Sequence, residues 1–538
     1  MKKSFLVLVS FALVYPTAAQ IWVRTYGDST FNTQSYRIIE HYDHGYFISA
    51  QKYNSGVFDF GWLLKTDING FPLWNKTFGD MNSGSPLIGI DNIDNGGLIM
   101  VGQTANYNQN WAAYVVKLNA CGEKDWCRLY RTPGRNVYGL GIQAIPGGGS
   151  IIMLGNWGTD WNKDLWLLRL DENGDIVWQQ AYGLSPLFDA PEGNHLFRTL
   201  DTNFVITDRV FSPDSGQTNQ YRTRPMIIRV SPDGTALFEL AWGTAMNFKG
   251  YGWASCDDKK GNLLSVVQSQ LSSPPYTGPC LIRTSKSGNP LQYKNLVDTA
   301  IIGGATTINW FADSTLAIGL IWKQVSGSGE PFIIGAMKTD SLGNKLKFKQ
   351  LIYDGDQPFN DAVMSYDNKV MLINSYYQTN TIKTFAFKLN SNLDYDSIYT
   401  HPFIYDSLCP HPVVSDTTSL ISCHVVHVGL DEPDANPETT KLKIFPNPAS
   451  RQVTIELPRY LVRKSAQAGV TITTVYHQWD KTTLTIYDLT GRSVYSEKVT
   501  DKTGEITLDV SAWHAGVYCA RLVFNNAEAA GQRFIVGY

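Results

Sequence analysis

The chain has 538 residues, of which 43% are hydrophobic and 17% charged, and it contains 46 glycines, 15 tryptophans and 28 tyrosines. This composition is typical of an ordered, turn-rich β protein rather than of a disordered or helical chain. The formal net charge of −3 provides no basic surface for nucleic acid or anionic lipid, so we expect neither as a partner.

The first nineteen residues, MKKSFLVLVSFALVYPTAA, place two lysines before a short apolar stretch and end in small residues. This order is that of a secretory signal peptide (residues 1–19), with cleavage expected after Ala19. The alternative is a membrane anchor, but the apolar stretch is too short to cross about 30 Å of hydrocarbon. We expect no transmembrane segment, and export permits disulfides in the mature chain.

Residues 20–405 repeat one pattern: an apolar run, a basic residue, four variable residues, a glycine and a second apolar run. The basic residues and glycines of six copies are Lys65 and Gly70, Lys117 and Gly122, Arg169 and Gly174, Arg229 and Gly234, Arg283 and Gly288, and Lys338 and Gly343. A seventh copy keeps Lys388 but has Leu393 at the glycine position. Further strand-like runs lie upstream in each unit. Four short strands repeated about every 53 residues are typical of a β-propeller blade.

The repeats predict an all-β fold with a seven-bladed propeller. The segment IWVRTYG (residues 21–27) resembles the fourth strand of the copies, so we expect it to pair with the last blade and close the ring. It either replaces or supplements the segment LDYDSIYT (393–400), and an eight-bladed ring is therefore the alternative. A tandem of β-sandwiches would need a period nearer about 100 residues.

The acidic stretch DLWLLRLDENGDIVWQQAYG (164–183) has the appearance of a calcium loop, with Asp171, Glu172 and Asp175 close together. Calcium needs about six to eight oxygen ligands, whereas the other copies supply one acid or none at these positions. The copies share a glycine beside Asn, Asp or Ser, which is the composition of a turn with positive φ. We therefore predict a hairpin turn at Gly174, and we expect no metal ion or cofactor.

The aromatic residues fall into two groups. Trp74, Trp126, Trp178 and Phe238 each follow a turn glycine by four residues, and this recurrence predicts packing between adjacent blades. Trp111, Trp157 and Trp161 do not recur and lie in loop-like segments. They are the candidate ligand-binding residues, because exposed indole rings can stack on a sugar or a peptide.

Seven cysteines follow the signal peptide: Cys121, Cys127, Cys256, Cys280, Cys409, Cys423 and Cys519. Cys121 and Cys127 flank one hairpin turn, whose register does not place them opposite each other. The next two would lie two strand spacings apart, about 9.6 Å, which is beyond disulfide reach. No such obstacle separates Cys409 from Cys423, so we predict a disulfide between them. They belong to residues 406–440, which end in an acidic, proline-containing linker.

From residue 441 to residue 538, short strands resume with alternating apolar residues, as in Val453, Ile455 and Leu457. About 100 residues of this kind predict a small immunoglobulin-like β-sandwich. The segments IFPNPAS, IYDLTGRSV, LDVSAWHAGVYCARL and QRFIVGY resemble, in this order, the C-terminal sorting domains of type IX secretion (Por system) cargo. The motif residues are Phe445, Pro446, Asn447, Pro448, Asp488, Gly491 and Gly516. The stretch at 459–481 is longer than the usual link between these strands.

This resemblance implies a secreted or outer-surface protein of a Gram-negative bacterium. It implies that the chain crosses the inner membrane by its signal peptide and the outer membrane through the type IX translocon, which is its expected partner. The domain would then be a targeting signal for export, commonly removed afterwards, rather than an active site.

The function of the propeller is open between two hypotheses. The first is a non-enzymatic scaffold that binds an extracellular glycan or protein. The second is a hydrolase or lyase acting on a polysaccharide or other polymer, with acids such as Asp160, Asp164 or Asp189 gathered at one end of the ring. The sequence lacks a GxSxG nucleophile motif, an HExxH zinc motif, a phosphate loop and sialidase-type aspartate boxes, which favours the first hypothesis.

Overall fold

The computed structural model describes residues 22–537 except 55–57, 80–83, 108–109, 158–162, 183–194, 214–220, 243–249, 271–276, 298–300, 325–331, 354–358, 379–380, 402, 429–441, 459–460, 468–469, 477–481, 500–503 and 525–526. Every regular element in this part of the chain is a β-strand, so the all-β prediction is confirmed. The expected signal peptide lies outside the described residues.

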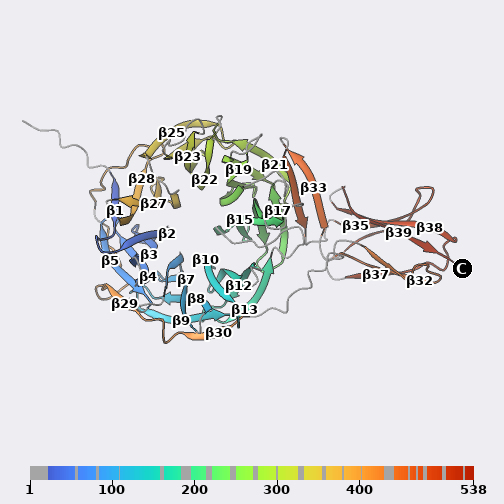
Figure 1. The fold of residues 1–538 in the computed structure, drawn as a ribbon, viewed down its shortest axis with the longest axis horizontal. Helices are drawn as coiled ribbons and strands as arrows, with labels where there is room; N and C mark the ends of the chain where they lie inside the picture. Colours follow the sequence, from blue (N-terminus) through green and yellow to red (C-terminus); the bar gives the residue numbers. More distant parts are fainter. Residues whose placement is uncertain are drawn as a thin grey trace, which may run out of the picture.

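Most of the chain forms a propeller-like ring of antiparallel sheets (Figure 1). In the described residues, six sheets each contain four consecutive strands, beginning near the axis and ending at the rim, and three of these sheets gain further strands from later parts of the chain. They are β2 (Asn32–Glu40), β3 (Tyr46–Asn54), β4 (Phe58–Thr66) and β5 (Pro72–Phe78); β6 (Leu87–Asn92), β7 (Leu98–Tyr107), β8 (Asn110–Leu118) and β9 (Lys124–Arg131); β10 (Asn136–Ala144), β11 (Ser150–Trp157), β12 (Lys163–Leu170) and β13 (Ile176–Tyr182); β14 (His195–Arg198), β15 (Phe204–Pro213), β16 (Tyr221–Val230) and β17 (Ala236–Trp242); β18 (Gly250–Asp257), β19 (Leu263–Gln270), β20 (Thr277–Thr284) and β21 (Pro290–Asn295); and β22 (Ile301–Trp310), β23 (Leu316–Gln324), β24 (Ile333–Thr339) and β25 (Lys345–Tyr353).

The remaining sheet of the ring joins the two ends of the repeat region. It contains β26 (Phe359–Met364), β27 (Val370–Gln378) and β28 (Thr381–Leu389), with β1 (Val23–Tyr26) as its outermost strand. β1 pairs antiparallel with β28, from Val23 opposite Phe387 to Tyr26 opposite Thr384. The segment 393–400 contributes only an isolated bridge, between Tyr395 and Leu389. The N-terminal strand therefore takes the fourth position in this sheet, as the sequence pattern predicted for ring closure.

Hairpin turns between the third and fourth strands of the sheets are the shared feature of the repeats, and the turn predicted at Gly174 is confirmed. Gly174 has φ +82°, and the Asp171 carboxylate accepts hydrogen bonds from the backbone N–H groups of Asn173 and Asp175, both at 2.9 Å. Asp171 therefore shapes the turn between β12 and β13.

The predicted packing of aromatic residues between adjacent sheets is also confirmed. A Cβ atom placed on Gly174 would lie 2.9 Å from the indole of Trp126 in the preceding sheet. Trp74 lies against Gly122, Trp178 against Gly234, and Phe238 against Gly288 in the same way. Trp22, just before β1, lies against Gly70 and donates a hydrogen bond to the carbonyl oxygen of Ile68 at 3.2 Å. The N-terminal segment thus contacts the first sheet as each outer strand contacts the next.

The repeated basic residue is explained by an acid that the sequence pattern did not single out. Lys65 pairs with Asp43, in the turn between the first two strands of its sheet, at 2.7 Å, and both side chains are buried. Four more repeats pair the basic residue with an aspartate of the same turn: Arg229 with Asp201, Arg283 with Asp258, Lys338 with Asp313, and Lys388 with Asp367. Since an unpaired buried charge is strongly destabilising, Lys65 and Asp43 are constrained as a pair.

After β28 the chain runs along the outside of the first two sheets as a segment that we call the strap (residues 403–428). Within it, β29 (Asp416–Thr418) pairs parallel with β5, and β30 (His424–His427) pairs parallel with β9. Two disulfides fix the strap to the second sheet, one between Cys121 and Cys409 and the other between Cys127 and Cys423.

The predicted disulfide between Cys409 and Cys423 is therefore wrong. The strap is extended along the sheet edges, so each of its two cysteines meets a different cysteine of the β8–β9 hairpin, with Cα–Cα distances of 4.9 and 4.8 Å. The strap has no counterpart among the repeats, so the sequence pattern could not place its cysteines beside the second sheet. Among the described residues Cys256, Cys280 and Cys519 are unbridged.

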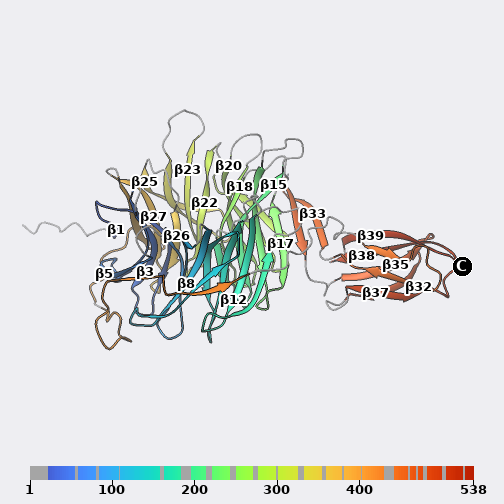
Figure 2. The same ribbon diagram turned by 60° about the horizontal axis from the view of Figure 1, so that its bottom comes forward.

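The C-terminal residues form two facing sheets (Figure 2). One contains β31 (Lys443–Phe445), β32 (Gln452–Glu456) and β37 (Glu505–Asp509), and the other contains β35 (Thr482–Asp488), β36 (Ser493–Lys498), β38 (Gly516–Phe524) and β39 (Ala527–Val536). The apolar alternation predicts the buried face correctly, because Val453, Ile455 and Leu457 are all buried.

The long stretch at 459–481 contains a hairpin that leaves these two sheets. Its strands are β33 (Leu461–Gln467) and β34 (Val470–Tyr476), and β34 pairs antiparallel with β17 from Glu239 opposite Val475 to Trp242 opposite Ile472. The fourth sheet of the ring thereby gains two strands from the C-terminal region (Figures 1 and 2). Buried residues of both regions, including Leu240, Trp242 and Leu442, belong to one apolar cluster.

Candidate functional site

A cavity of about 730 Å³ lies at the axis of the ring, and all seven ring sheets contribute to its lining. Its volume is in the range of small-molecule sites. The aromatic lining residues are Tyr36, Tyr138, Trp157, Trp253, Tyr376 and Tyr377. The polar lining residues include Gln34, Arg37, Gln103, His195, Asn360 and Asp361. Most of these side chains come from the first strand of a sheet, the strand nearest the axis.

Trp157, one of the three tryptophans singled out from the sequence, lines this cavity at the end of β11. Its ring centroid lies 4.5 Å from that of Tyr138, and the ring centroid of Trp111, in β8, lies 5.8 Å from that of Tyr138. Gly155 is opposite Tyr138 in the strand register, and a Cβ atom there would lie 2.9 Å from the indole nitrogen of Trp157. Glycine thus leaves room for the indole. Trp161 lies outside the described residues.

Arg37 and Asp361 join the first and last sheets of the ring inside the cavity. The guanidinium Nη1 atom of Arg37 lies 3.8 Å from Oδ1 of Asp361, whose Oδ2 accepts a hydrogen bond from the Ile38 backbone N–H at 3.0 Å. Burial raises the pKa of Asp361, and the charge of Arg37 opposes this shift. Beside them, Asn360 donates a hydrogen bond to the carbonyl oxygen of Ser35 at 2.6 Å. This group fixes the polar wall of the cavity.

Two buried nitrogen atoms in the lining have no hydrogen-bond partner within the described part of the chain. They are Nε1 of Trp253 and Nδ1 of His195. Burial lowers the pKa of His195 to about 3, and the positive charge of Arg37 contributes to this shift, so the imidazole is neutral at ordinary pH. Because buried polar groups are normally paired, these two atoms are available to a bound molecule.

Tyr36 is fixed from behind by residues of its own sheet. Its hydroxyl donates a hydrogen bond to Oε1 of Gln51 at 2.6 Å. The Gln51 side chain in turn hydrogen bonds the carboxyl group of Asp59, whose pKa burial raises to about 6. The aromatic face of Tyr36 is therefore held at the cavity wall by a polar chain.

The acids named for the enzyme hypothesis are not seen at this cavity. Asp160 and Asp189 lie outside the described residues, and of Asp164 only the backbone, in β12, is described. Among the described lining residues, Asp361 provides the single carboxyl group, and it lies beside Arg37. Glycoside hydrolysis typically uses two carboxyl groups about 5 to 9.5 Å apart.

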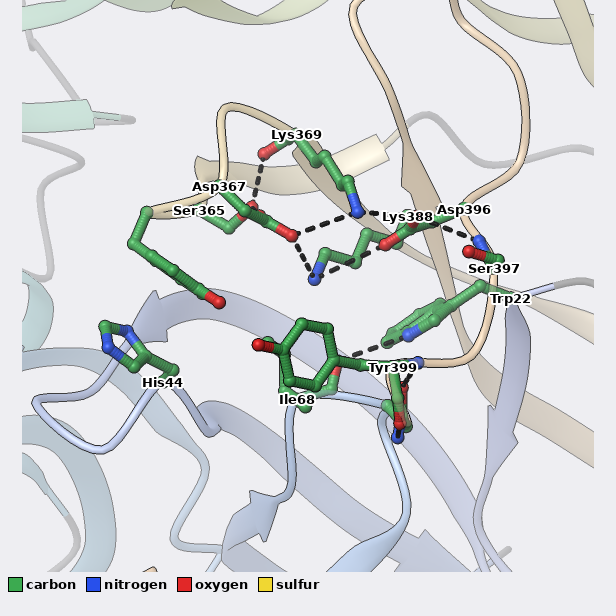
Figure 3. Close-up of polar contacts among 12 residues, drawn as sticks. Trp22, His44, Ile68, Ser365, Asp367, Lys369, Lys388, Asp396, Ser397 and Tyr399 are labelled. Atoms are coloured by element: carbon green, nitrogen blue, oxygen red, sulfur yellow. Dashed lines mark hydrogen bonds and ion pairs between the residues drawn. The ribbon is translucent and has the colours of Figure 1, made fainter. Parts of the chain in front are cut away.

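A second cluster of charged groups lies at the seam of the ring (Figure 3). Nζ of Lys369 lies 2.6 Å from Asp396 and 3.1 Å from Asp367, and Nζ of Lys388 lies 3.4 and 3.6 Å from Asp367 and Asp396. Each charge therefore has its partner inside the cluster. We interpret the cluster as a structural element of ring closure.

Residues of the C-terminal motif contact the last strand, β39, and the turn between β35 and β36. Oδ1 of Asn447 accepts a hydrogen bond from the Ile535 backbone N–H at 2.8 Å. Asp488 caps the turn between β35 and β36 by accepting from the N–H groups of Thr490 and Arg492, while Gly491 has φ +82°. Phe445, Pro446 and Pro448 flank Asn447, and Gly516 begins β38.

A family model described as a secretion system C-terminal sorting domain matches residues 443–537. The C-terminal region is a type IX secretion sorting domain. A chain with this sorting domain is cargo of the Por secretion machinery, exported to the outer surface or the medium. In the described part of the chain no helix has the length and apolar character needed to cross a membrane.

No curated protein sequence matches the chain. Solved structures with similarity include a protein of unknown function from Dyadobacter fermentans (10% identity, TM-score 0.41, covering 68% of this chain and 98% of that one). Others are a prolyl endopeptidase (13%, TM-score 0.38, 79% and 53%) and an exo-β-1,3-galactanase from Phanerochaete chrysosporium (11%, TM-score 0.26, 79% and 100%). Similarity at these scores establishes neither the fold nor the activity of this chain.

Proposed function

We propose that the exported protein is a non-enzymatic binding protein whose ligand, an extracellular glycan, enters the axial cavity. The observation that carries this proposal is the cavity itself, in which aromatic rings from several sheets surround a few fixed polar groups. Sugar rings present apolar C–H faces and hydroxyl groups, so they match aromatic surfaces that alternate with hydrogen-bonding side chains. The row of Trp111, Tyr138 and Trp157 offers consecutive rings along which a glycan chain would extend.

The architecture completes the proposal. We take the seven ring sheets as the blades of a propeller spanning residues 20–405, residues 406–440 as the disulfide-bearing segment with its linker, and residues 441–538 as an immunoglobulin-like sorting domain. The antiparallel four-stranded sheets and the closing strand β1 support this interpretation. The mature chain would begin at Gln20 after removal of residues 1–19.

A hydrolase or lyase remains the alternative function, and one experiment separates the two. The purified full chain is applied to a glycan and peptide array, and every ligand that binds is then incubated with the protein and examined for cleavage. Retention of a glycan without cleavage supports a binding protein. Cleavage of the retained glycan supports the enzyme, and binding restricted to peptides contradicts the glycan proposal.

A further inference from the structure

The two disulfides that fix the strap differ in their access to solvent. Cys127 and Cys423 are each 6% exposed, whereas Cys121 and Cys409 are partly exposed. Thiol–disulfide exchange requires that a thiolate reach one of the sulfur atoms. A small dithiol can therefore reach the outer bridge, Cys121–Cys409, while the inner bridge is shielded by the core of the second sheet.

The imidazole of His411 lies beside the outer bridge. Its Nδ1 atom is 3.6 Å from Sγ of Cys409, and the two sulfur atoms and one imidazole nitrogen all lie within 4.8 Å of one another. A tetrahedral zinc ion with Zn–S distances of about 2.3 Å holds two sulfurs about 3.8 Å apart, so the two sulfurs must separate after reduction to bind such an ion. The Nδ1 atom also lies 3.5 Å from the carbonyl oxygen of Pro412.

Glu123 provides a carboxylate beside His411, as is common next to a metal-bound histidine. Its Oε1 atom lies 3.6 Å from Nε2 of His411, the ring nitrogen that faces away from the sulfurs. The other carboxylate oxygen of Glu123 accepts a hydrogen bond from the Asn119 side chain at 2.9 Å. Histidine ligands usually donate their second ring N–H to a carboxylate, which orients the ring and selects its tautomer.

We propose that Cys121, Cys409 and His411 form a redox-gated site for a soft divalent cation of the zinc class, with Glu123 as a positioning residue. A dithiol reduces the outer bridge: the disulfide takes up two electrons and two protons to give two thiols, and the dithiol becomes a disulfide. The cation then displaces both thiol protons and is bound by two thiolates, the Nδ1 atom of His411 and water at the fourth position.

The strap keeps the site assembled after the outer bridge opens. The inner bridge joins Cys127 to Cys423, and the parallel pairings of β29 with β5 and of β30 with β9 do not depend on the outer bridge. The Cα atoms of Cys121 and Cys409, 4.9 Å apart, therefore stay near each other. In the oxidised chain the sulfurs are bonded to each other and the cation has no thiolate ligand.

The test uses the full chain and Co²⁺ as a probe, because thiolate-bound cobalt has a charge-transfer absorption. The chain is treated with increasing concentrations of dithiol, its free thiols are alkylated, and mass spectrometry locates the label. Cys121 and Cys409 should be labelled at a lower dithiol concentration than Cys127 and Cys423. The opened chain should then bind one Co²⁺ with the thiolate absorption. Opening of both bridges at the same dithiol concentration, or an opened chain without the absorption, would overturn the proposal.

Single substitutions distinguish this site from adventitious binding. His411→Ala should weaken cobalt binding at least tenfold, and Glu123→Gln should weaken it by about 10- to 100-fold, as for other partners of metal-bound histidines. His424→Ala, an exposed histidine elsewhere on the strap, is the matched control and should leave the affinity unchanged. Near-ultraviolet circular dichroism checks that each variant is folded. Equal affinities for wild type and His411→Ala would contradict the assignment.

Discussion

Trp126 donates a hydrogen bond from its indole nitrogen to the carbonyl oxygen of Glu172 in the next sheet, at 2.9 Å. Four residues after Trp126, the Tyr130 hydroxyl donates to the carbonyl oxygen of Gly174 at 2.6 Å. Trp178 and Tyr182 make the same two contacts with Pro232 and Gly234. The hairpin turns are therefore acceptors that hold successive sheets together, which is why their sequences recur.

Replacement of the glycine under Trp126 should destabilise the ring. In Gly174→Ala the new Cβ atom would meet the indole and would occupy a left-handed backbone conformation, with φ +82°. Gly134→Ala is the matched control, because Gly134 also has a positive φ, +73°, but in the described part of the chain no atom would lie within 4 Å of its new Cβ. We expect the free energy of unfolding to fall by about 1–3 kcal/mol more for Gly174→Ala than for the control. Urea denaturation measures the difference, and equal losses would refute the packing role.

The disulfide pairing makes a second prediction. Peptide mapping of the unreduced protein should recover Cys121 joined to Cys409 and Cys127 joined to Cys423. Removal of the inner bridge by the double substitution Cys127→Ser and Cys423→Ser should lower the free energy of unfolding by about 2–5 kcal/mol, because it closes a long loop and is buried. Recovery of a peptide joining Cys409 to Cys423 would contradict the structure.

The stability of the ring should depend on His41. This imidazole is buried and its Nδ1 atom lies 2.8 Å from Oδ1 of Asn92, and burial lowers its pKa to about 4 from an ordinary value near 6.5. Between about pH 6.5 and pH 4 the unfolded chain binds a proton at His41 that the folded chain does not. Stability should therefore decrease as the pH falls through this window. The free energy of unfolding, measured at several pH values, should fall less steeply for His41→Asn than for wild type. Parallel curves would contradict the role given to His41.

The pairing of the β33–β34 hairpin with β17 should protect the outer backbone groups of β17 from hydrogen exchange. Replacement of residues 459–481 by a short glycine–serine linker would remove β34, the pairing partner of Glu239–Trp242. Hydrogen exchange should then become faster for the peptides that cover β17, because their outward backbone groups become exposed to water. Peptides covering β13, an outer strand with no added strand in the described chain, should be unchanged. Unchanged exchange in β17 would mean that the hairpin does not pair there.

The repeat pattern predicted the sheets, the hairpin turns and the aromatic contacts, because each recurs with the period of the repeat. The strap could not be placed from sequence, since Cys121 and Cys409 are 288 residues apart and share no local pattern. The cavity was only partly predicted. Trp157 was found because it breaks the repeat, whereas Arg37, His195 and Trp253 lie on different first strands and meet only once the ring closes.

The claim that the axial cavity binds a glycan is tested most directly by calorimetric titration of the full chain with the best glycan from the array. Trp157→Ala should weaken binding at least tenfold, because it removes a ring from the cavity wall. Phe71→Ala, which removes an exposed ring that is not part of the cavity lining, is the control and should bind like wild type. Wild-type affinity in Trp157→Ala would contradict the cavity as the glycan site.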